Sequence, residues 1–425
     1  MHRADCACLR VAIVCLLGAI VAACGESRSA ARPAFSQRDS AGITIAESAT
    51  PEWTAPAQGW HLADTAEWVI GAQGLGQGNT DQVPLSRVVS VIVLPGGRVL
   101  LGNDGSQQLL LYDSLGRLER TLSGPGDGPG ELRVIRTVFP CRGDTIVVQQ
   151  VYSLDVFDVK QGFVRRLSTH DGRPASVRAA APDCRRFVRS GAVRLPPPGE
   201  HGALLQTVMW VDTAFTVLDT VAVDSVPGVF TVVNQETAND ELYPKVPPWT
   251  ADVPLIAADT FVVRGHAIRP ELQWLWPDGR IQRIVRWRQL PVPVTNHDRA
   301  LYTEKRRFWL AHAGSNPVAR SMLPDLDDWH DVPRIKPFFD KIRVDDEGDV
   351  WVLKNSLTQQ LYEHFPPVEP EPPERWMIFT PSGRWLGELE MPERFQLHAV
   401  TSARVYGVAK DSLDVETVRA YRILK

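Results

Sequence analysis

The sequence predicts an all-β protein in which one short structural unit recurs six times. From about residue 88 onward, apolar segments of about four to seven residues alternate with tight turns rich in Gly, Asp and Asn. The segments form six similar groups, and a complete group has room for about four strands. A small sheet cannot bury both of its faces alone, whereas six sheets in a closed ring cover one another. The predicted fold is therefore a six-bladed β-propeller.

The first and fifth repeats show the pattern most clearly. In the first, strand-like Val88–Leu94 precedes the turn Pro95–Gly97, and strand-like Arg98–Leu101 follows it. In the fifth, the turn Asp345–Gly348 leads into strand-like Asp349–Val352. Repeats three and four are weaker copies of the same unit, so their strands are less well defined.

The sixth repeat has room for only about three strands before Lys425. Two strand-like segments, Ile43–Ala46 and Trp60–Ile70, precede the first repeat. We expect one of them to pair with the last repeat as its missing strand. The ring would then be closed by an N-terminal strand and would leave no open sheet edge at the junction.

The composition agrees with a folded protein that contains many turns. Of the 425 residues, 44% are hydrophobic and 23% are charged, which excludes a disordered or coiled-coil chain. Gly and Pro number 31 and 33, as expected for many short connections. The 46 Lys and Arg against 50 Asp and Glu give a net charge of -4. We expect no nucleic-acid partner, because such binding requires a broad basic surface.

The chain starts with two arginines and an apolar run, Val11–Val21. This run is shorter than the roughly 20 residues that span a bilayer, so it is typical of a secretion signal. It ends in Val-Ala-Ala-Cys at Cys24, which resembles the lipobox of bacterial lipoproteins. The resemblance implies cleavage before Cys24, a lipid on its sulfur and, because Gly25 follows, an outer-membrane location. The alternative is a plain secretory signal cut after Ala23, with Cys24 as a free thiol.

We expect three parts along the chain. Residues 1–23 form the lipoprotein signal peptide, and residues 24–41, rich in Ser, Ala and Arg, form a flexible tether. Residues 42–425 form the propeller. The membrane is therefore an expected partner, reached through the N-terminal lipid.

Two insertions interrupt the repeats. A capping-box-like start and one apolar face predict a helix at about residues 295–314, with Lys305–Arg307 on its solvated face. The run of prolines at 366–373 predicts an extended, stiff loop.

Two cysteines, Cys141 and Cys184, remain in the predicted folded part. They occupy the same turn in consecutive repeats, and an exported chain meets an oxidising compartment. We therefore predict a disulfide between adjacent blades. Two buried free thiols are the alternative.

The repeats resemble the NHL-type six-bladed β-propellers, and in particular a group of bacterial lipoproteins with this fold. The resemblance is carried by Gly124–Leu132 between the first two repeats, by Asp346–Val352 and by the closing Val415–Tyr421. It covers roughly residues 42–425. It implies the fold and leaves the ligand open.

The sequence contains no recognisable catalytic constellation. Neither Gly-x-Ser-x-Gly nor His-Glu-x-x-His occurs, and the ten His residues are scattered. The Gly-rich segment 124–130 lacks the spacing of a phosphate-binding loop, and Asp345–Asp349 lacks that of an EF-hand. We therefore expect no cofactor and no metal, and we read Asp345–Asp349 as a plain hairpin turn.

One set of polar residues shares a position in the repeats. In a propeller, the ends of the second strands emerge on one face around the central channel. The residues at this position are Asn103, Gln150, Ser190, Arg264, Lys354 and Lys410. Because cations and amides gather there in an acidic chain, we expect a binding rim for a small anionic or polyol ligand. A solvated rim without a ligand is the alternative.

Three functions remain open. The leading hypothesis is a non-catalytic, lipid-anchored propeller that binds a small ligand or an envelope protein. The alternative is a metal-dependent hydrolase or lyase with its site in the channel, as in the gluconolactonase-like and amidating-lyase propellers. Such a metal needs carboxylate, amide or imidazole ligands from several repeats, whereas the expected rim contains Lys and Arg. The third hypothesis is a purely structural platform.

Overall fold

The protein is described by a computed structural model, which covers residues 33–54, 59–71, 83–169, 174–234, 241–246, 248–251, 253–257, 261–312, 332–355 and 372–425. The chain divides into two units, residues 1–34 and residues 35–425, and the architecture below is that of the second. The predicted signal peptide and residues 366–371 of the predicted Pro-rich loop lie outside the described residues.

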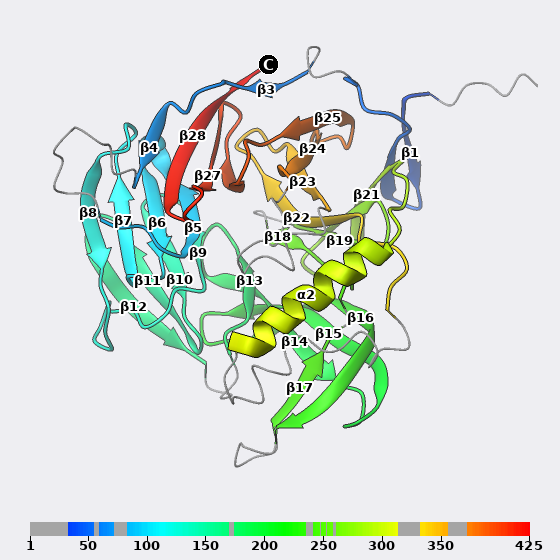
Figure 1. Ribbon diagram of the computed structural model, residues 1–425, viewed down its shortest axis with the longest axis horizontal. Helices are drawn as coiled ribbons and strands as arrows, with labels where there is room; N and C mark the ends of the chain where they lie inside the picture. Colours follow the sequence, from blue (N-terminus) through cyan, green and yellow to red (C-terminus); the bar gives the residue numbers. More distant parts are fainter. Residues whose placement is uncertain are drawn as a thin grey trace, which may run out of the picture. The chain divides into compact units, whose positions relative to one another are not determined.

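Six small sheets form a ring around a central axis, which confirms the predicted six-bladed β-propeller (Figure 1). The first blade contains β5 (Val88–Val93), β6 (Val99–Asn103), β7 (Gln108–Tyr112) and β8 (Leu118–Ser123). The second blade contains β9 (Thr137–Pro140), β10 (Thr145–Gln149), β11 (Ser153–Asp158) and β12 (Gly162–Ser168). The third blade contains β13 (Val177–Ala180), β14 (Arg186–Arg194), β15 (His201–Asp212), β16 (Val217–Asn234) and β17 (Glu241–Lys245). The fourth blade contains β18 (Leu255–Ala257), β19 (Val262–Gly265), β20 (Glu271–Leu275) and β21 (Ile281–Trp287). The fifth blade contains β22 (Phe339–Val344), β23 (Val350–Lys354), β24 (Arg375–Phe379) and β25 (Trp385–Glu390). The sixth blade contains β26 (Phe395–Val400), β27 (Arg404–Lys410) and β28 (Glu416–Leu424). The predicted turn Pro95–Gly97 is a single 3₁₀ turn between β5 and β6.

The first strand of each blade is the innermost one. These six strands contact one another in order around the axis, from β5 through β9, β13, β18 and β22 to β26. Strand β26 contacts β5, so the inner circle is complete. The inner strands therefore line the central channel.

The sixth blade is completed by residues from the start of the folded unit. Strand β28, the last strand of the chain, pairs antiparallel with β3 (His61–Leu62) and β4 (Trp68–Ile70). The expectation that one of the two N-terminal segments supplies the missing strand is thus confirmed, and the segment is Trp60–Ile70. Ile43–Ala46, the other segment considered, lies in β2 (Ile43–Ser48), which pairs parallel with β21 in the fourth blade.

The N-terminal segment lies along the outer edges of three consecutive blades. After β2 on the fourth blade, the amides of Glu52 and Trp53 donate to the carbonyls of Trp385 (3.0 Å) and Leu386 (2.9 Å) in β25 of the fifth blade. Strands β3 and β4 then pair with the sixth blade. We call residues 35–54 and 59–70 the N-terminal strap; it appears in blue in Figure 1.

The predicted tether is too long at its C-terminal end. Residues Phe35–Ser40 form strand β1, which pairs with β2 across a turn at Ala41 and Gly42. Both turn residues have positive φ, 51° and 80°, as a tight hairpin of this kind requires. The segment has no apolar alternation, because it is held by backbone pairing at an exposed edge rather than by a buried face.

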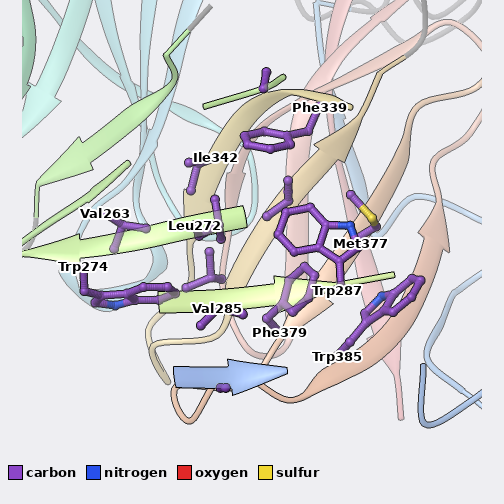
Figure 2. Packing of buried hydrophobic residues seen from close by; sticks show 14 residues of the cluster. Val263, Leu272, Trp274, Val285, Trp287, Phe339, Ile342, Met377, Phe379 and Trp385 are labelled. Atoms are coloured by element: carbon purple, nitrogen blue, oxygen red, sulfur yellow. The ribbon is translucent and has the colours of Figure 1, made fainter. Parts of the chain in front are cut away.

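The hydrophobic core is divided among the junctions between blades. Among the residues that the structure describes, six clusters of buried side chains are present, and each contains residues from two neighbouring blades. Figure 2 shows the cluster between the fourth and fifth blades, where Trp287 lies beside Phe339 and Phe379 with ring centroids 5.6 and 4.9 Å apart. Because every blade covers its neighbours, the packing of each sheet depends on a closed ring.

The predicted helix is present as α2, Asn296–His312. Thr295 and Asp298 form the expected reciprocal cap: the Thr295 amide donates to the Asp298 carboxylate (2.8 Å), and the Asp298 amide donates to the Thr295 hydroxyl (3.2 Å). The prediction for Lys305 is wrong, since it is only 1% exposed. Lys305 lies three residues after buried Tyr302 and so shares the face that packs against Trp249.

The predicted disulfide is also present. Cys141 and Cys184, with Cα atoms 5.7 Å apart, join the first hairpin turns of the second and third blades. The Arg142 amide donates to the Pro182 carbonyl (2.6 Å) beside it. The bond therefore holds two adjacent blades together, as their equivalent repeat positions predicted.

Ile70 and Val69 provide a test of the strap as part of the fold. Ile70 is 3% exposed and packs between the sixth and first blades, whereas Val69, next to it in β4, is 39% exposed. Ile70→Asp should lower the free energy of unfolding by about 3–5 kcal/mol, because it places a carboxylate in the core. Val69→Asp should change it by less than about 1 kcal/mol. Urea denaturation followed by tryptophan fluorescence measures both, and equal midpoints would show that β4 is dispensable.

Candidate functional site

The longer connections in the part of the propeller that the structure describes emerge on one face. In antiparallel blades, the link between the second and third strands lies on the same side as the link to the next blade. The described parts of these links include residues 83–87, 124–136, 195–200, 288–312 and 332–338, and the fourth of these contains α2. The opposite face has short turns such as Asp113–Arg117, Asp345–Asp349 and Thr380–Arg384. We call the first side the long-connection face.

The six expected rim residues all belong to this face. Asn103, Lys354 and Lys410 are the last residues of β6, β23 and β27, and Gln150 directly follows β10. Arg264 is the penultimate residue of β19. Ser190 lies inside β14 rather than at its end, because β14 and β15 extend beyond the length of the other blades. Five of the six residues thus lie at or next to the end of a second strand, and the binding role of the set stays a prediction.

Asn103 is buried, and its side chain is hydrogen-bonded to the connection that leads into β5. It is 0% exposed, and its side-chain oxygen accepts from the Ser86 amide (2.9 Å). Its amide group donates to the Pro84 carbonyl (3.0 Å) and the Ser106 hydroxyl (2.7 Å). These bonds hold the segment before β5 against the turn after β6. Asn103 therefore stabilises the long-connection face as a buried residue.

Gln150 has the same role in the second blade. Its oxygen accepts from the Arg133 amide (3.1 Å), and its amide group donates to the Asp155 carboxylate (2.9 Å). Arg166 donates to the other oxygen of Asp155 (2.7 Å), which satisfies this fully buried acid. Ser190 is also buried, at 9% exposure. Three of the six expected rim residues thus face the interior.

The three cations of the rim are each paired with a carboxylate. Arg264 donates to Asp224 (2.7 Å), and the Lys354 ammonium lies 2.9 Å from Glu388. Lys410 lies 3.8 Å from Glu416, the residue opposite it in the β27–β28 ladder. The rim therefore has little excess positive charge, because neighbouring strands and blades supply a negative partner for each positive charge.

The Arg264 pair forms the core of a buried polar network between the third and fourth blades. Asp224 is 3% exposed, and its second oxygen, Oδ2, is buried and has no hydrogen-bond partner among the described residues. The His266 ring lies 3.2 Å from its first oxygen. Arg264 also donates to Gln273 (3.3 Å), which donates in turn to Glu271 (2.8 Å). Within the described part of the chain, no hydroxyl or thiol is hydrogen-bonded to the His266 ring.

Asp345–Asp349 forms the hairpin turn that the sequence predicts. The Asp345 carboxylate accepts from the amides of Glu347 (3.0 Å) and Asp349 (2.9 Å) and from the Trp351 indole (3.1 Å). Burial, together with the nearby Asp345 charge, raises the pKa of Asp349 to about 6. Among the residues that the structure describes, no group of three or more His, Cys, Asp or Glu side chains could hold a metal ion.

No protein-family model matches the chain, and no curated protein matches it. Solved structures with a similar fold include a Bacteroides fragilis protein described as a candidate exported protein (11% identity, TM-score 0.44, covering 90% of this chain and 100% of that one). A Bacteroides vulgatus member of the duf4221 family has 11% identity and a TM-score of 0.45, with 86% and 99% coverage. A streptogramin B lyase has 8% identity and a TM-score of 0.39, with 87% and 99% coverage. We draw no functional conclusion from similarities at this level.

In the described parts of the chain, no helix is long and apolar enough to cross a membrane.

The buried and exposed cations of the rim should differ in their effect on stability. Arg264→Ala leaves the Asp224 carboxylate buried without its partner, and we expect a loss of about 3–5 kcal/mol. Lys410→Ala removes a cation that is 43% exposed and lies 3.8 Å from its partner, so we expect a loss below about 0.5 kcal/mol. The urea midpoints of the two variants, compared with that of the unchanged chain, measure the difference. A midpoint for Arg264→Ala as high as that for Lys410→Ala would contradict the structural role of the Asp224 network.

Proposed function

We propose that this chain is a lipid-anchored, non-catalytic binding module of the bacterial envelope. The observation that carries the proposal is that the longer described connections, such as residues 124–136 and 288–312, lie on one face of the ring, while the described turns of the other face are short. Propellers present ligand or partner sites on connections of this kind, supported by a rigid ring. The ring supplies rigidity, and the connections supply the variable contact surface.

The rim favours a hydroxyl-rich ligand over a simple anion. Each exposed cation has a carboxylate beside it, so the rim offers donors and acceptors together and has little excess positive charge. Neighbouring hydroxyl groups of a glycan need this combination, since every hydroxyl both donates and accepts. The proposed ligand is therefore a neutral polyol or glycan, and a polar protein surface is the second outcome to be tested.

The anchor is supported by the lipobox-like ending at Cys24. Strand β1 starts at Phe35, so 35 - 24 = 11 residue steps separate the proposed lipid from the folded unit. A chain of this length reaches at most about 40 Å. The propeller would then stay close to the membrane surface to which its lipid is attached, with the outer membrane proposed from Gly25.

Replacement of the lipid-bearing cysteine tests the anchor. In a bacterial host with a lipoprotein pathway, the full chain should incorporate radiolabelled palmitate and sediment with membranes. Cys24→Ala should lose the label and appear in the soluble fraction, because the only proposed acylation site is gone. The Cys141→Ser, Cys184→Ser double variant is the matched control and should keep its label. Equal labelling of the Cys24→Ala chain would refute lipidation at this residue.

The binding face is tested with a panel of soluble envelope oligosaccharides and isothermal titration calorimetry. We expect the Lys354→Gln, Lys410→Gln double variant to bind the recovered oligosaccharide at least about tenfold more weakly, corresponding to about 1.4 kcal/mol. Lys160→Gln is the control: Lys160 is also paired with a carboxylate, Asp144, but lies in a short turn of the opposite face. Equal losses in both variants would contradict the proposed face. A stoichiometric divalent metal in the purified protein would favour the hydrolase or lyase instead.

A further inference from the structure

An exposed apolar patch lies on the long-connection face, beside the junction of the fourth and fifth blades. Leu290 and Val292, which follow β21, are 78% and 48% exposed, and Ile335, which precedes β22, is 48% exposed. Ile268, in the link between β19 and β20, is 59% exposed. We call these four residues the apolar patch. A single exposed hydrophobic side chain is common on a protein surface, whereas a group of them marks a contact surface.

Backbone pairing brings three of the four residues onto one short ribbon. The Lys336 amide donates to the Val292 carbonyl (2.8 Å), and Pro293 lies opposite Ile335 in an antiparallel bridge. Because the hydrogen bonds flank this bridge, the side chains of Pro293 and Ile335 lie close together on one side of the ribbon. Pro293 and its neighbour Pro291 are exposed as well, so they extend the apolar surface.

The base of the patch is held in place by the fold. The Phe338 amide donates to the Ala267 carbonyl (2.7 Å), which places Ile268 beside the second segment of the ribbon. The Lys336 ammonium lies 2.9 Å from the Asp298 carboxylate at the start of α2 and ties the ribbon to the helix. The backbone of the patch is thus fixed although its apolar side chains are exposed. A surface with a fixed backbone loses little conformational entropy when it binds.

Three exposed arginines border the patch. Arg269 follows Ile268, Arg334 precedes Ile335, and Arg288 is two residues before Leu290. Among the described residues, none of the three has an ion-pair partner, unlike the cations of the rim. An arginine can lay its apolar stem on a hydrocarbon surface while its guanidinium binds phosphate oxygens. Apolar side chains with basic residues around them are therefore suited to an anionic membrane surface.

The start of the folded unit lies close to the patch. Strands β1 and β2 lie along β21 at the outer edge of the fourth blade (Figure 1). Phe35, the first residue of β1, is paired with Ser48, and the Ser48 carbonyl accepts from the Arg288 amide (3.0 Å). Two strand spacings, about 10 Å, therefore separate Phe35 from Arg288. Because the tether from Cys24 reaches at most about 40 Å, a lipid on Cys24 holds the patch near a membrane surface.

We propose that the apolar patch docks onto the anionic surface of the membrane that holds the N-terminal lipid. Its apolar side chains enter the boundary between headgroups and acyl chains, and the bordering arginines bind lipid phosphates. Docking turns the long-connection face towards the membrane, so the ligand of the rim is met at the headgroup level. The proposal deepens the proposed anchoring and rests on it, because the tether is what brings the patch to the membrane.

Vesicle binding by the lipid-free protein tests the patch. The purified Cys24→Ala chain should co-sediment with vesicles of phosphatidylglycerol and phosphatidylethanolamine. The Leu290→Asp, Ile335→Asp double variant should bind them at least about tenfold more weakly, because it places two carboxylates in the contact. Leu115→Asp is the matched control, since Leu115 is 64% exposed in a short turn of the opposite face and should be without effect. Unchanged urea midpoints would show that the variants are folded.

The bordering arginines have a matched control as well. Arg288→Gln and Arg334→Gln should each weaken vesicle binding about fivefold at low ionic strength and less at high ionic strength. Arg185→Gln should have no effect, since Arg185 is an exposed arginine in the first hairpin turn of the third blade, on the opposite face.

A fluorescent label reports which face meets the lipid. In the Cys24→Ala chain, Val292→Cys provides a thiol for an environment-sensitive dye, and Leu115→Cys provides one on the opposite face. We expect vesicles to shift the dye emission to shorter wavelength at position 292 and to leave it unchanged at position 115. An equal shift at both positions would overturn the proposal, because the chain would then have no preferred membrane face.

The proposal would also be overturned by a lipid-free chain that does not bind the vesicles, or by equal losses in the patch variant and Leu115→Asp. A patch variant that keeps vesicle binding but loses self-association in analytical ultracentrifugation would assign the patch to a second copy of the chain instead. Palmitate labelling at Cys24 is a separate measurement. The anchor can therefore fail while the lipid-free chain still binds vesicles, and the patch can fail while the label is retained.

Discussion

The pairing of β28 with β3 and β4 is the interaction on which the other features of the structure depend. It joins the last strand of the chain to the first strands of the folded unit and so converts a row of six sheets into a ring. The strap also bonds to the fourth and fifth blades before it reaches the sixth. Because every hydrophobic cluster lies between two blades, an open ring would expose the apolar face of a blade on each side of the break. Closure therefore protects both the core and the unpaired edge of β28.

The polar features of the molecule follow from the same geometry. The Arg264–Asp224 pair joins the third and fourth blades, and the Arg343–His398 contact joins the fifth and sixth. Glu416 lies beside Lys410 and also accepts from the Val88 amide (2.8 Å), so it connects the sixth blade to the first across the closure. Charged side chains at these junctions have fixed positions only because the ring sets the distance between blades. The candidate binding groups are thus a consequence of blade packing rather than of any local motif.

Local signals account for what the sequence could predict. The repeated turns gave the six blades, the Thr295 and Asp298 cap gave α2, and equivalent turn positions gave the disulfide between Cys141 and Cys184. Partners from other blades could not be predicted, because Asp224 and Arg264 are 40 residues apart and their contact depends on the tilt and spacing of two sheets. The rim therefore looked basic in the sequence although its cations are paired.

Native-state hydrogen exchange of the strap amides tests the claim of ring closure most directly. The informative amides are those of Trp53, Ala63 and Glu67, which donate to the carbonyls of Leu386 (2.9 Å), Arg422 (2.9 Å) and Ala420 (2.8 Å). If the strap closes the ring, these amides open only when the whole propeller unfolds, and their opening free energies should equal those of the buried strand β6. Opening free energies several kcal/mol lower, with β6 still protected, would show that the propeller remains folded without the strap and would contradict the account.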